Sequence, residues 1–557
     1  MGRMKQAGAK SPEKGANMHK GTKKAWAVLL ILVAALLANA PSAFACTIVA
    51  AGTEAMADGS TVVTHNDDSS GADFRLWITP GAKNGPDALR DLVIDSHNYG
   101  DFGQYPKVKD YGNGTLVAQI PEAPQTYSYF HSRYSFINEK GVSMGESTFN
   151  FDKSTPIRKK TYDLIYGKNL GLIDCWNAQD IALERATTAR EAARVMGDLV
   201  EKYGWKDPGE TINIADGNEV WVAEFYGLDL WAAVRLPKNA FFVAANRARI
   251  DHIDFNDHEN YMYSPNLKSF AVENGLWSEA SGVHFSPAEI YAPYEGLYST
   301  RREWRAFDLV APSLKLDPNA KRFPLYVVPE RKLTVQDILE IKSDYYNGTE
   351  YDLSRTLDAG PYGDPLAPFH KERSINLFRT CYVMIANVKA WLPDEAKCLV
   401  WYGYGAPDST YIVPLWPTMK KLPELYVTGN RYEEFRRDSG WWTNSYVQQV
   451  ARINYQSAIK DLHDFRNPKL ASQYKVTEEI QNTAAALIKA GKKAEAIDLL
   501  TSFGCANAQI WHDEWLAFGD QLLGTYMWGS KKMKLQPPTK WWNDIAAQAP
   551  LKPLEKK

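Results

Sequence analysis

A cysteine at position 46 stands directly after a segment with the features of a secretory signal. Residues 25–38 (AWAVLLILVAALLA) are apolar throughout, but these fourteen residues fall short of the ~20 that cross a bilayer. Three lysines between positions 20 and 24 precede this run, and Ala43-Phe44-Ala45 has the A-x-A form of a cleavage site. The pattern predicts cleavage after Ala45, export to the periplasm or the extracellular space, and no stable membrane insertion afterwards.

Cleavage would make Cys46 the first residue of the mature chain, where two chemistries use a cysteine. One is lipidation, but Ala43 and Phe44 stand where lipoprotein signals have Leu and a small residue. The other is nucleophilic attack by the thiol, with the free α-amine of the same residue as the base. An α-amine has a pKa near ~7.7, so it accepts a proton close to neutral pH. This favours a nucleophile, and a lipid-anchored binding protein is the alternative from another class.

Asp68 and Asn246 carry groups that such a nucleophile uses. Asp68 follows a strand-like run expected beside the Cys46 strand, so its carboxylate could orient the α-amine; a turn residue is the alternative. Asn246 ends the apolar run 241–245, and a buried amide there is costly unless it has a partner. Its N–H₂ group could stabilise a developing oxyanion, and an Asn in a turn is the alternative.

Basic and polar residues near these positions are candidates for binding substrate. Arg302 and Arg305 are three residues apart and share a predicted helix face, which Arg301 flanks. A basic side chain near a thiolate lowers the thiol pKa and can hold a carboxylate, whereas a solvated basic face is the alternative. His65 and Asn66 are expected to point to opposite sides of their strand, and His65 could contact substrate or be a core histidine.

The pattern of hydrophobic residues predicts an α+β protein. Residues 211–226 alternate around Asp216-Gly217 as in a hairpin, and Thr188 begins a helix that ends at Gly204. After about residue 430 the period becomes helical. Other strand-like runs form two pairs, 230–236 with 240–246 and 380–389 with 397–404, and the helical stretches are 447–462, 477–490 and 492–502.

Six stretches, in order, resemble the dipeptidase A family of cysteine N-terminal nucleophile (Ntn) hydrolases. The mature start Cys46-Thr47 and the later His65-Asn66-Asp67-Asp68-Ser69 correspond to the family's Cys-Thr opening and its Arg-Asn-x-Asp-Ser motif. His65 departs from that motif, in which arginine is usual. The remaining stretches are 138–148 (NEKGVSMGEST), 215–224, 244–250, 300–307 (TRREWRAF) and 401–414 with 439–442. The resemblance spans roughly residues 46 to 460.

The resemblance implies a four-layer αββα Ntn-hydrolase sandwich with a mainly helical C-terminal extension. The corresponding domains are a signal peptide (1–45), a catalytic domain (46–430) and a mainly helical region (431–557). The implied catalytic residues are Cys46, Asp68, Asn246 and Arg302, and the implied substrate-binding residues are His65, Asn66, Glu146, Ser147 and Arg301.

The resemblance also implies an exported cysteine dipeptidase that forms a thioester acyl-enzyme. A linear-amide acylase of the bile-salt or penicillin V type, which shares the nucleophile, is the alternative within enzymes. The expected partners are small peptides, and a homo-oligomer is compatible with the sequence. The sequence does not indicate which dipeptide side chains the enzyme prefers.

Composition and motifs exclude several other functions. The chain has 557 residues with 64 Lys and Arg against 66 Asp and Glu and no basic cluster, so nucleic acid is not an expected partner. No CxxC, HExxH, P-loop or GxGxxG motif is present, so we expect no metal and no other cofactor. Gly141-Val-Ser143-Met-Gly145 matches the G-x-S-x-G elbow, but its flanks do not read as strand and helix. Cys381 and Cys398, on paired strand-like runs, could form a disulfide, and Cys175 and Cys505 could pair or stay buried.

Overall fold

The structure is a computed structural model that describes residues 46–68, 75–94, 115–166, 171–429, 434–531 and 539–548. The predicted signal peptide, residues 1–45, lies outside the described residues. The described residues all belong to one compact unit, which runs from Phe44 to Lys557.

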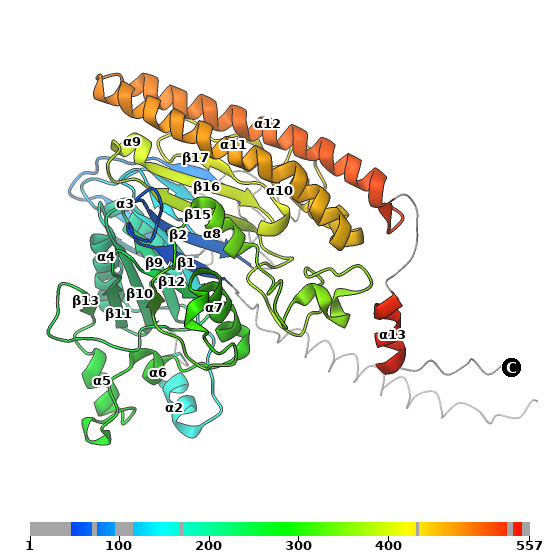
Figure 1. Cartoon of the computed structure of the whole chain (residues 1–557). Coiled ribbons are helices and arrows are strands. Elements are labelled where there is room, and N and C mark those ends of the chain that lie inside the picture. Colours follow the sequence, from blue (N-terminus) through cyan, green and yellow to red (C-terminus); the bar gives the residue numbers. More distant parts are fainter. Residues whose placement is uncertain are drawn as a thin grey trace, which may run out of the picture. The chain divides into compact units, whose positions relative to one another are not determined.

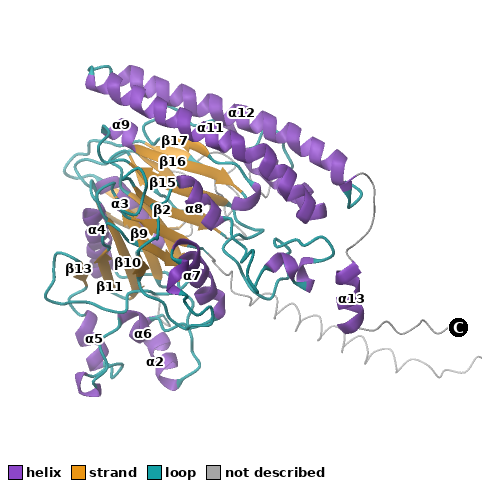
Figure 2. Ribbon diagram, in the orientation of Figure 1, coloured by secondary structure: helices purple, strands orange, loops and turns teal. Residues whose placement is uncertain are grey.

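Two antiparallel sheets form the centre of this unit (Figure 2). The strands of the first sheet are β1 (Ile48–Ala51), β2 (Thr61–Asp67), β12 (Phe241–Ala244), β14 (Tyr326–Val327), β15 (Tyr382–Val388), β16 (Cys398–Tyr404) and β17 (Val413–Leu415). They lie in the order β14-β12-β1-β2-β15-β16-β17.

The second sheet is larger and accompanied by a separate two-stranded ribbon. Its strands are β3 (Trp77–Thr79), β6 (Tyr129–His131), β7 (Ile137–Asn138), β8 (Ser143–Thr148), β9 (Glu210–Ala215), β10 (Val220–Gly227), β11 (Leu230–Arg235) and β13 (Tyr261–Tyr263). Their order is β13-β11-β10-β9-β8-β7-β6-β3. The ribbon pairs β4 (Leu89–Ile94) with β5 (Thr115–Pro121).

The two sheets pack against each other through their central strands. β1 and β2 of the first sheet contact β8 and β9 of the second, and β1 and β2 are buried along their whole length. Gly145 on β8 allows the closest approach, because a Cβ at this position would lie 2.4 Å from the carbonyl oxygen of Thr64 on β2. The sheets therefore meet tightly next to His65 and Glu146.

Helices cover both sheets (Figure 1). Their bounds are α2 (Pro156–Ile165), α3 (Cys175–Arg185), α4 (Ala189–Tyr203), α5 (Leu267–Glu273), α6 (Pro287–Tyr291), α7 (Leu297–Val310), α8 (Val335–Lys342), α9 (Asp394–Lys397), α10 (Gly440–Ala451), α11 (Tyr455–Lys489), α12 (Lys493–Tyr526) and α13 (Thr539–Gln548). α4 packs on β9, β10 and β11 of the second sheet. α7 contacts β12, α8 contacts β15, and the long antiparallel pair α11 and α12 lies along β16 and β17 of the first sheet.

These elements confirm the predicted α+β class and several of the predicted local structures. β9 and β10 form the hairpin at Asp216-Gly217, where Gly217 has φ 92°, and β15 pairs with β16. Thr188 caps α4 by accepting a hydrogen bond from the Glu191 N–H, and the helix ends at Gly204 with φ 75°. The helical C-terminal region is also present, as α10 to α12.

The runs 230–236 and 240–246 are both strands, β11 and β12, but they do not pair with each other. β11 stays in the second sheet beside β10, whereas β12 pairs with β1 and β14 in the first sheet. The loop at Pro237-Lys238-Asn239 therefore carries the chain from one sheet to the other. This crossing puts the residues that follow β12 next to the start of β1.

The predicted Cys381–Cys398 disulfide is wrong. No disulfide joins any of the five cysteines, all of which lie among the described residues. β15 and β16 are antiparallel, so Cys398 lies opposite Val388 at one end of the pair, while Cys381 precedes Tyr382 at the other. Cys175 and Cys505 are not paired either: Cys175 is buried on α3 and Cys505 is half-buried on α12.

Among the described residues, no helix combines the length and the apolar character that a membrane span needs.

Candidate active site

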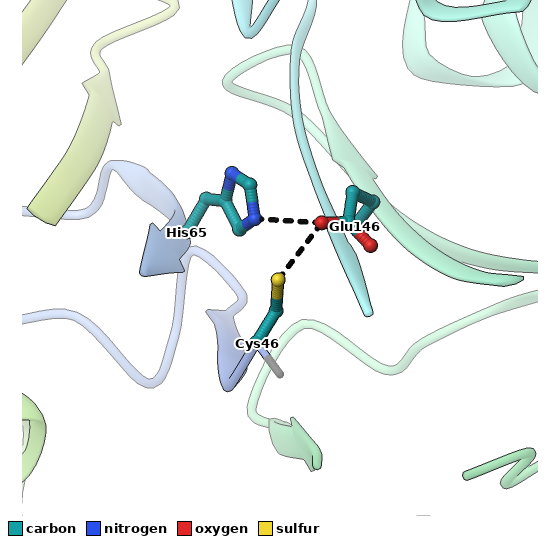
Figure 3. A group of neighbouring side chains, drawn as sticks. All are labelled: Cys46, His65 and Glu146. Atoms are coloured by element: carbon teal, nitrogen blue, oxygen red, sulfur yellow. Dashed lines mark hydrogen bonds and ion pairs between the residues drawn. The ribbon is translucent and has the colours of Figure 1, made fainter. Parts of the chain in front are cut away.

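Cys46 lies two residues before the start of β1, and only 1% of its surface is exposed. Its Sγ donates a hydrogen bond to Glu146 Oε1 on β8, at 2.9 Å (Figure 3). The contact between β1 and β8 brings the two side chains together. A thiol and a carboxylate separated by 99 residues of sequence thus share one buried site.

His65 is the third member of this group. Its Nε2 lies 3.0 Å from Glu146 Oε1 (Figure 3). Its Nδ1 lies 2.9 Å from the hydroxyl of Tyr382 on the neighbouring strand β15. When the Tyr382 hydroxyl donates to Nδ1, Nε2 carries the proton and donates to Glu146. His65 is fully buried and contacts the carboxylate nearest the thiol, whereas its neighbour Asn66 points elsewhere.

The electrostatics of this group oppose ionisation of the thiol. Burial raises the pKa of Cys46 well above its usual value, and the negative charges of Glu146, Asp67 and Asp68 raise it further. Burial also acts to raise the pKa of Glu146, but the hydrogen bond and attraction of His65 outweigh burial and lower it. The carboxylate is therefore ionised beside a protonated thiol.

Arg302 on α7 joins Cys46 to the end of β12. Its Nη1 donates to the Cys46 carbonyl oxygen at 2.9 Å and to Thr47 Oγ1 at 2.8 Å. Its Nη2 donates to the Ala245 carbonyl oxygen at 3.1 Å and to Asn246 Oδ1 at 2.9 Å. This fully buried, planar guanidinium thus holds both the backbone of Cys46 and the side chain of Asn246 in place.

Asn246 follows β12 in a left-handed conformation, with φ 61°. Asparagine tolerates this conformation better than most residues. Its backbone N–H donates to Ser147 Oγ at 2.8 Å, and its Nδ2 donates to the Thr148 carbonyl oxygen at 2.9 Å. Arg302 and Arg373 both donate to Oδ1, so the amide is oriented with its N–H₂ group toward β8.

Asp68 lies directly after β2, as the sequence predicts. Its carboxylate pairs with Arg373 and accepts a hydrogen bond from Thr380. Burial raises the pKa of Asp68, and the charge of Arg373 acts in the opposite direction. Arg373 also donates to the Tyr298 hydroxyl at 2.9 Å, so it connects Asp68 to Asn246 and α7.

The other three predicted substrate-binding positions differ in their surroundings. Ser147 holds the Asn246 backbone, as described above. Asn66 is fully buried, and neither atom of its amide has a hydrogen-bond partner among the described residues. Arg301 does not join the group around Cys46; it pairs with Glu372 at 2.9 Å and lies over the ring of Tyr351.

Several residues of this site escaped the sequence analysis. Arg373 and Thr380 lie in loops without regular structure, and Tyr382 is one aromatic residue in an apolar strand. Lys342, at the end of α8, donates to the Thr47 carbonyl oxygen, and burial lowers its pKa to about 7. Nothing in the local sequence marks these residues, because only the tertiary fold brings them to Cys46.

Two further features of this region concern metal binding and serine chemistry. Sγ of Cys46, Nε2 of His65 and a carboxylate oxygen of Glu146 lie within 4.8 Å of one another, which is close enough for a cation to bridge them. Ser143, the centre of the G-x-S-x-G match, lies within β8 and donates to the Ala215 carbonyl oxygen at 3.3 Å. A nucleophile elbow requires a turn between strand and helix at this position, so the match has no catalytic context.

Comparisons with known proteins find similarity to a peptidase family and to proteins named dipeptidases. The profile of peptidase family C69 matches residues 107–467. A probable dipeptidase A of Streptococcus pyogenes serotype M18 is 25% identical over 448 residues, which cover 79% of this chain and 88% of the relative.

Two other relatives carry similar names. A probable dipeptidase of Latilactobacillus sakei is 27% identical over 484 residues (82% of this chain and 90% of the relative). Dipeptidase A of Lactobacillus helveticus is 24% identical over 450 residues (78% and 87%). The chain belongs to peptidase family C69.

Proposed function

We propose that this protein is an exported cysteine dipeptidase of the Ntn-hydrolase type, with Cys46 as its N-terminal nucleophile. The observation that carries the proposal is the hydrogen-bonded group around Cys46. The thiol stands at the start of β1, and one arginine, Arg302, connects its carbonyl oxygen to the amide of Asn246. Membership of family C69 and the relatives named dipeptidases support amide hydrolysis.

The arrangement of layers is consistent with this class. Two antiparallel sheets packed face to face, with α4 on one and α7, α8, α11 and α12 on the other, support a four-layer αββα sandwich. In the proposed mature chain, removal of residues 1–45 leaves a free α-amine on Cys46. This α-amine would take the proton from the thiol during the attack.

The proposed reaction proceeds through a thioester. Sγ attacks the amide carbon of the dipeptide, an S–C bond forms, and the thiol proton moves to the α-amine. The Asn246 N–H₂ group, positioned by Arg302 and Arg373, stabilises the oxyanion. The C–N bond then breaks as the α-ammonium returns the proton to the leaving amine. Water hydrolyses the thioester with the α-amine again as base, which releases the second amino acid and restores the thiol.

The proposal is tested with the chain that begins at Cys46, assayed on alanyl-alanine by release of free alanine. We expect hydrolysis by the unchanged protein, none by Cys46→Ala, and slow or undetectable turnover by Cys46→Ser, because a hydroxyl is the poorer nucleophile. Cys505→Ser on α12 is the matched control and should retain activity. Hydrolysis by Cys46→Ala would refute the proposal, and so would a lipid-modified Cys46 found by mass spectrometry of the exported protein.

A further inference from the structure

We propose that Glu146 binds the α-ammonium group of the dipeptide, so that the site accepts substrates with a free amino terminus and rejects their uncharged analogues. This inference rests on the proposed function, because it assigns a group of the substrate to the site around Cys46.

The charge of the site favours a cationic substrate. Glu146 is fully buried, and in the described part of the chain His65 is its only basic partner within 4.0 Å. During catalysis negative charge develops on Sγ, 2.9 Å from the same carboxylate, and the α-ammonium of Cys46 offsets only part of the repulsion between the two. Two buried like charges this close are costly, and a cation supplied by the substrate lowers this cost.

The distance between Glu146 and Sγ suits such an acceptor. In a dipeptide, the α-nitrogen and the carbonyl carbon that Sγ attacks are bonded to the same Cα, so they lie about 2.5 Å apart. A carbon poised for attack is about 3–3.5 Å from the nucleophile. With a hydrogen bond of about 3 Å, an acceptor for the α-ammonium must therefore lie within about 9 Å of Sγ. Glu146 Oε1, at 2.9 Å from Cys46 Sγ, meets this requirement.

A second carboxyl group lies on the strand next to Glu146. Glu210 on β9 is buried, burial and the charge of Glu146 raise its pKa well above the usual value, and its Oε2 has no hydrogen-bond partner among the described residues. An ammonium group has three N–H donors. Two neighbouring carboxyl groups can thus accept hydrogen bonds from two of the three N–H donors. An apolar substrate group in place of the ammonium would leave both carboxyl groups without these hydrogen bonds.

Ammonium binding also resolves the unfavourable environment of the thiol. Without substrate, the Cys46 thiol donates to Glu146, whose charge disfavours the thiolate. A bound ammonium takes over Glu146 as its acceptor and offsets its charge. The substrate that is to be cleaved therefore helps to activate the nucleophile, and a substrate without the ammonium does not.

The test compares two substrates that differ only in this group: alanyl-alanine and propionyl-alanine, in which hydrogen replaces the α-ammonium. For the chain beginning at Cys46, we expect kcat/KM for propionyl-alanine to be lower by about 10³-fold or more, because this substrate brings no cation to Glu146. In Glu146→Gln, kcat/KM for alanyl-alanine should fall by about 10²-fold or more, and the two substrates should then differ by less than about tenfold. Glu219→Gln, a half-exposed carboxylate before β10, is the matched control and should keep the full preference.

The outcomes separate this inference from the proposed function. Equal hydrolysis of both substrates by the unchanged chain would overturn the role of Glu146 and leave an amide hydrolase of the acylase type. Hydrolysis of neither substrate would refute the dipeptidase itself. The preference of the unchanged chain needs no variant, so its absence overturns the proposal even where Glu146→Gln fails to fold. A preference that changes when EDTA is added would assign the group to a metal and also overturn the proposal.

Discussion

At the residue scale, the position of Glu146 beside Cys46 determines how easily the thiol ionises. Burial and the charge of Glu146 both raise the pKa of Cys46. Removing the charge in Glu146→Gln should therefore lower that pKa. Alkylation of Cys46 by iodoacetamide, followed against pH by mass spectrometry, should then reach its plateau at lower pH than in the unchanged chain. The same profile in both would show that Glu146 does not act on the thiol, and Glu219→Gln should leave the profile unchanged.

Asn246 gives a second prediction at this scale. Asn246→Ala removes the proposed oxyanion donor and should lower kcat for alanyl-alanine by about 10²–10³-fold, with a much smaller change in KM. Steady-state kinetics give kcat and KM separately and so show which of the two changes. Asn256→Ala, in an exposed turn, should have neither effect. A change confined to KM would place Asn246 in substrate binding instead.

The sequence identified those residues of the site that stand in a recognisable local sequence context. Cys46 follows a cleavage pattern, and Asn246 ends an apolar run, so both could be named from local context. Arg373 and Lys342 could not, because they come from a loop and a helix end that are unremarkable in sequence. The contact between His65 and Glu146 depends on the packing of β2 against β8, which no local pattern encodes.

At the element scale, the packing of α4 on the second sheet leaves no room for a side chain at one glycine of the helix. Glycine inside a helix is normally destabilising relative to alanine by roughly 0.5–1 kcal/mol. At Gly197, however, a Cβ would lie 2.2 Å from the indole of Trp231 on β11. Gly197→Ala should therefore destabilise the protein, by about 1–3 kcal/mol in urea unfolding.

Gly524 on α12 is the matched control for this change. A Cβ there meets no atom within 4 Å, so Gly524→Ala should stabilise the protein by up to about 1 kcal/mol. Opposite signs for the two substitutions are the expected result. Stabilisation by Gly197→Ala would mean that α4 does not lie against Trp231 as described.

The strands themselves were easier to predict than the strands with which they pair. The strands β11 and β12 both follow from alternating and apolar runs, yet the chain crosses between sheets at Pro237, and period-2 alternation does not report which sheet a strand joins. The expected Cys381–Cys398 bridge failed for the same kind of reason: antiparallel register places the two cysteines at opposite ends of a strand pair.

At the scale of the whole molecule, the C-terminal helices complete the first sheet. Trp511 stacks on Tyr411 with ring centroids 5.1 Å apart, and Gln473 donates to the Ile412 carbonyl oxygen at 2.8 Å. Arg466 donates to the Thr410 carbonyl oxygen at 3.0 Å. The stacking contact covers the ring of Tyr411. The two hydrogen bonds provide partners for the backbone carbonyl oxygens of Thr410 and Ile412.

A chain truncated after residue 430 should therefore lose soluble, cooperative folding. The comparison is with a chain truncated after residue 531, which keeps α10, α11 and α12, and the measurement is thermal unfolding by circular dichroism. A cooperative transition in the shorter chain would show that residues 46–430 are an independent domain, as the sequence analysis expects.

In the proposed mechanism, the α-amine of Cys46 is the base for its own thiol. Its most direct test compares the chain that begins at Cys46 with the same chain carrying one additional residue before it, which converts the amine into an amide without basic character. Both forms retain the thiol, which alkylation verifies. We predict that hydrolysis of alanyl-alanine falls by at least about 10²-fold in the extended form. Equal activity of the two forms would contradict the account.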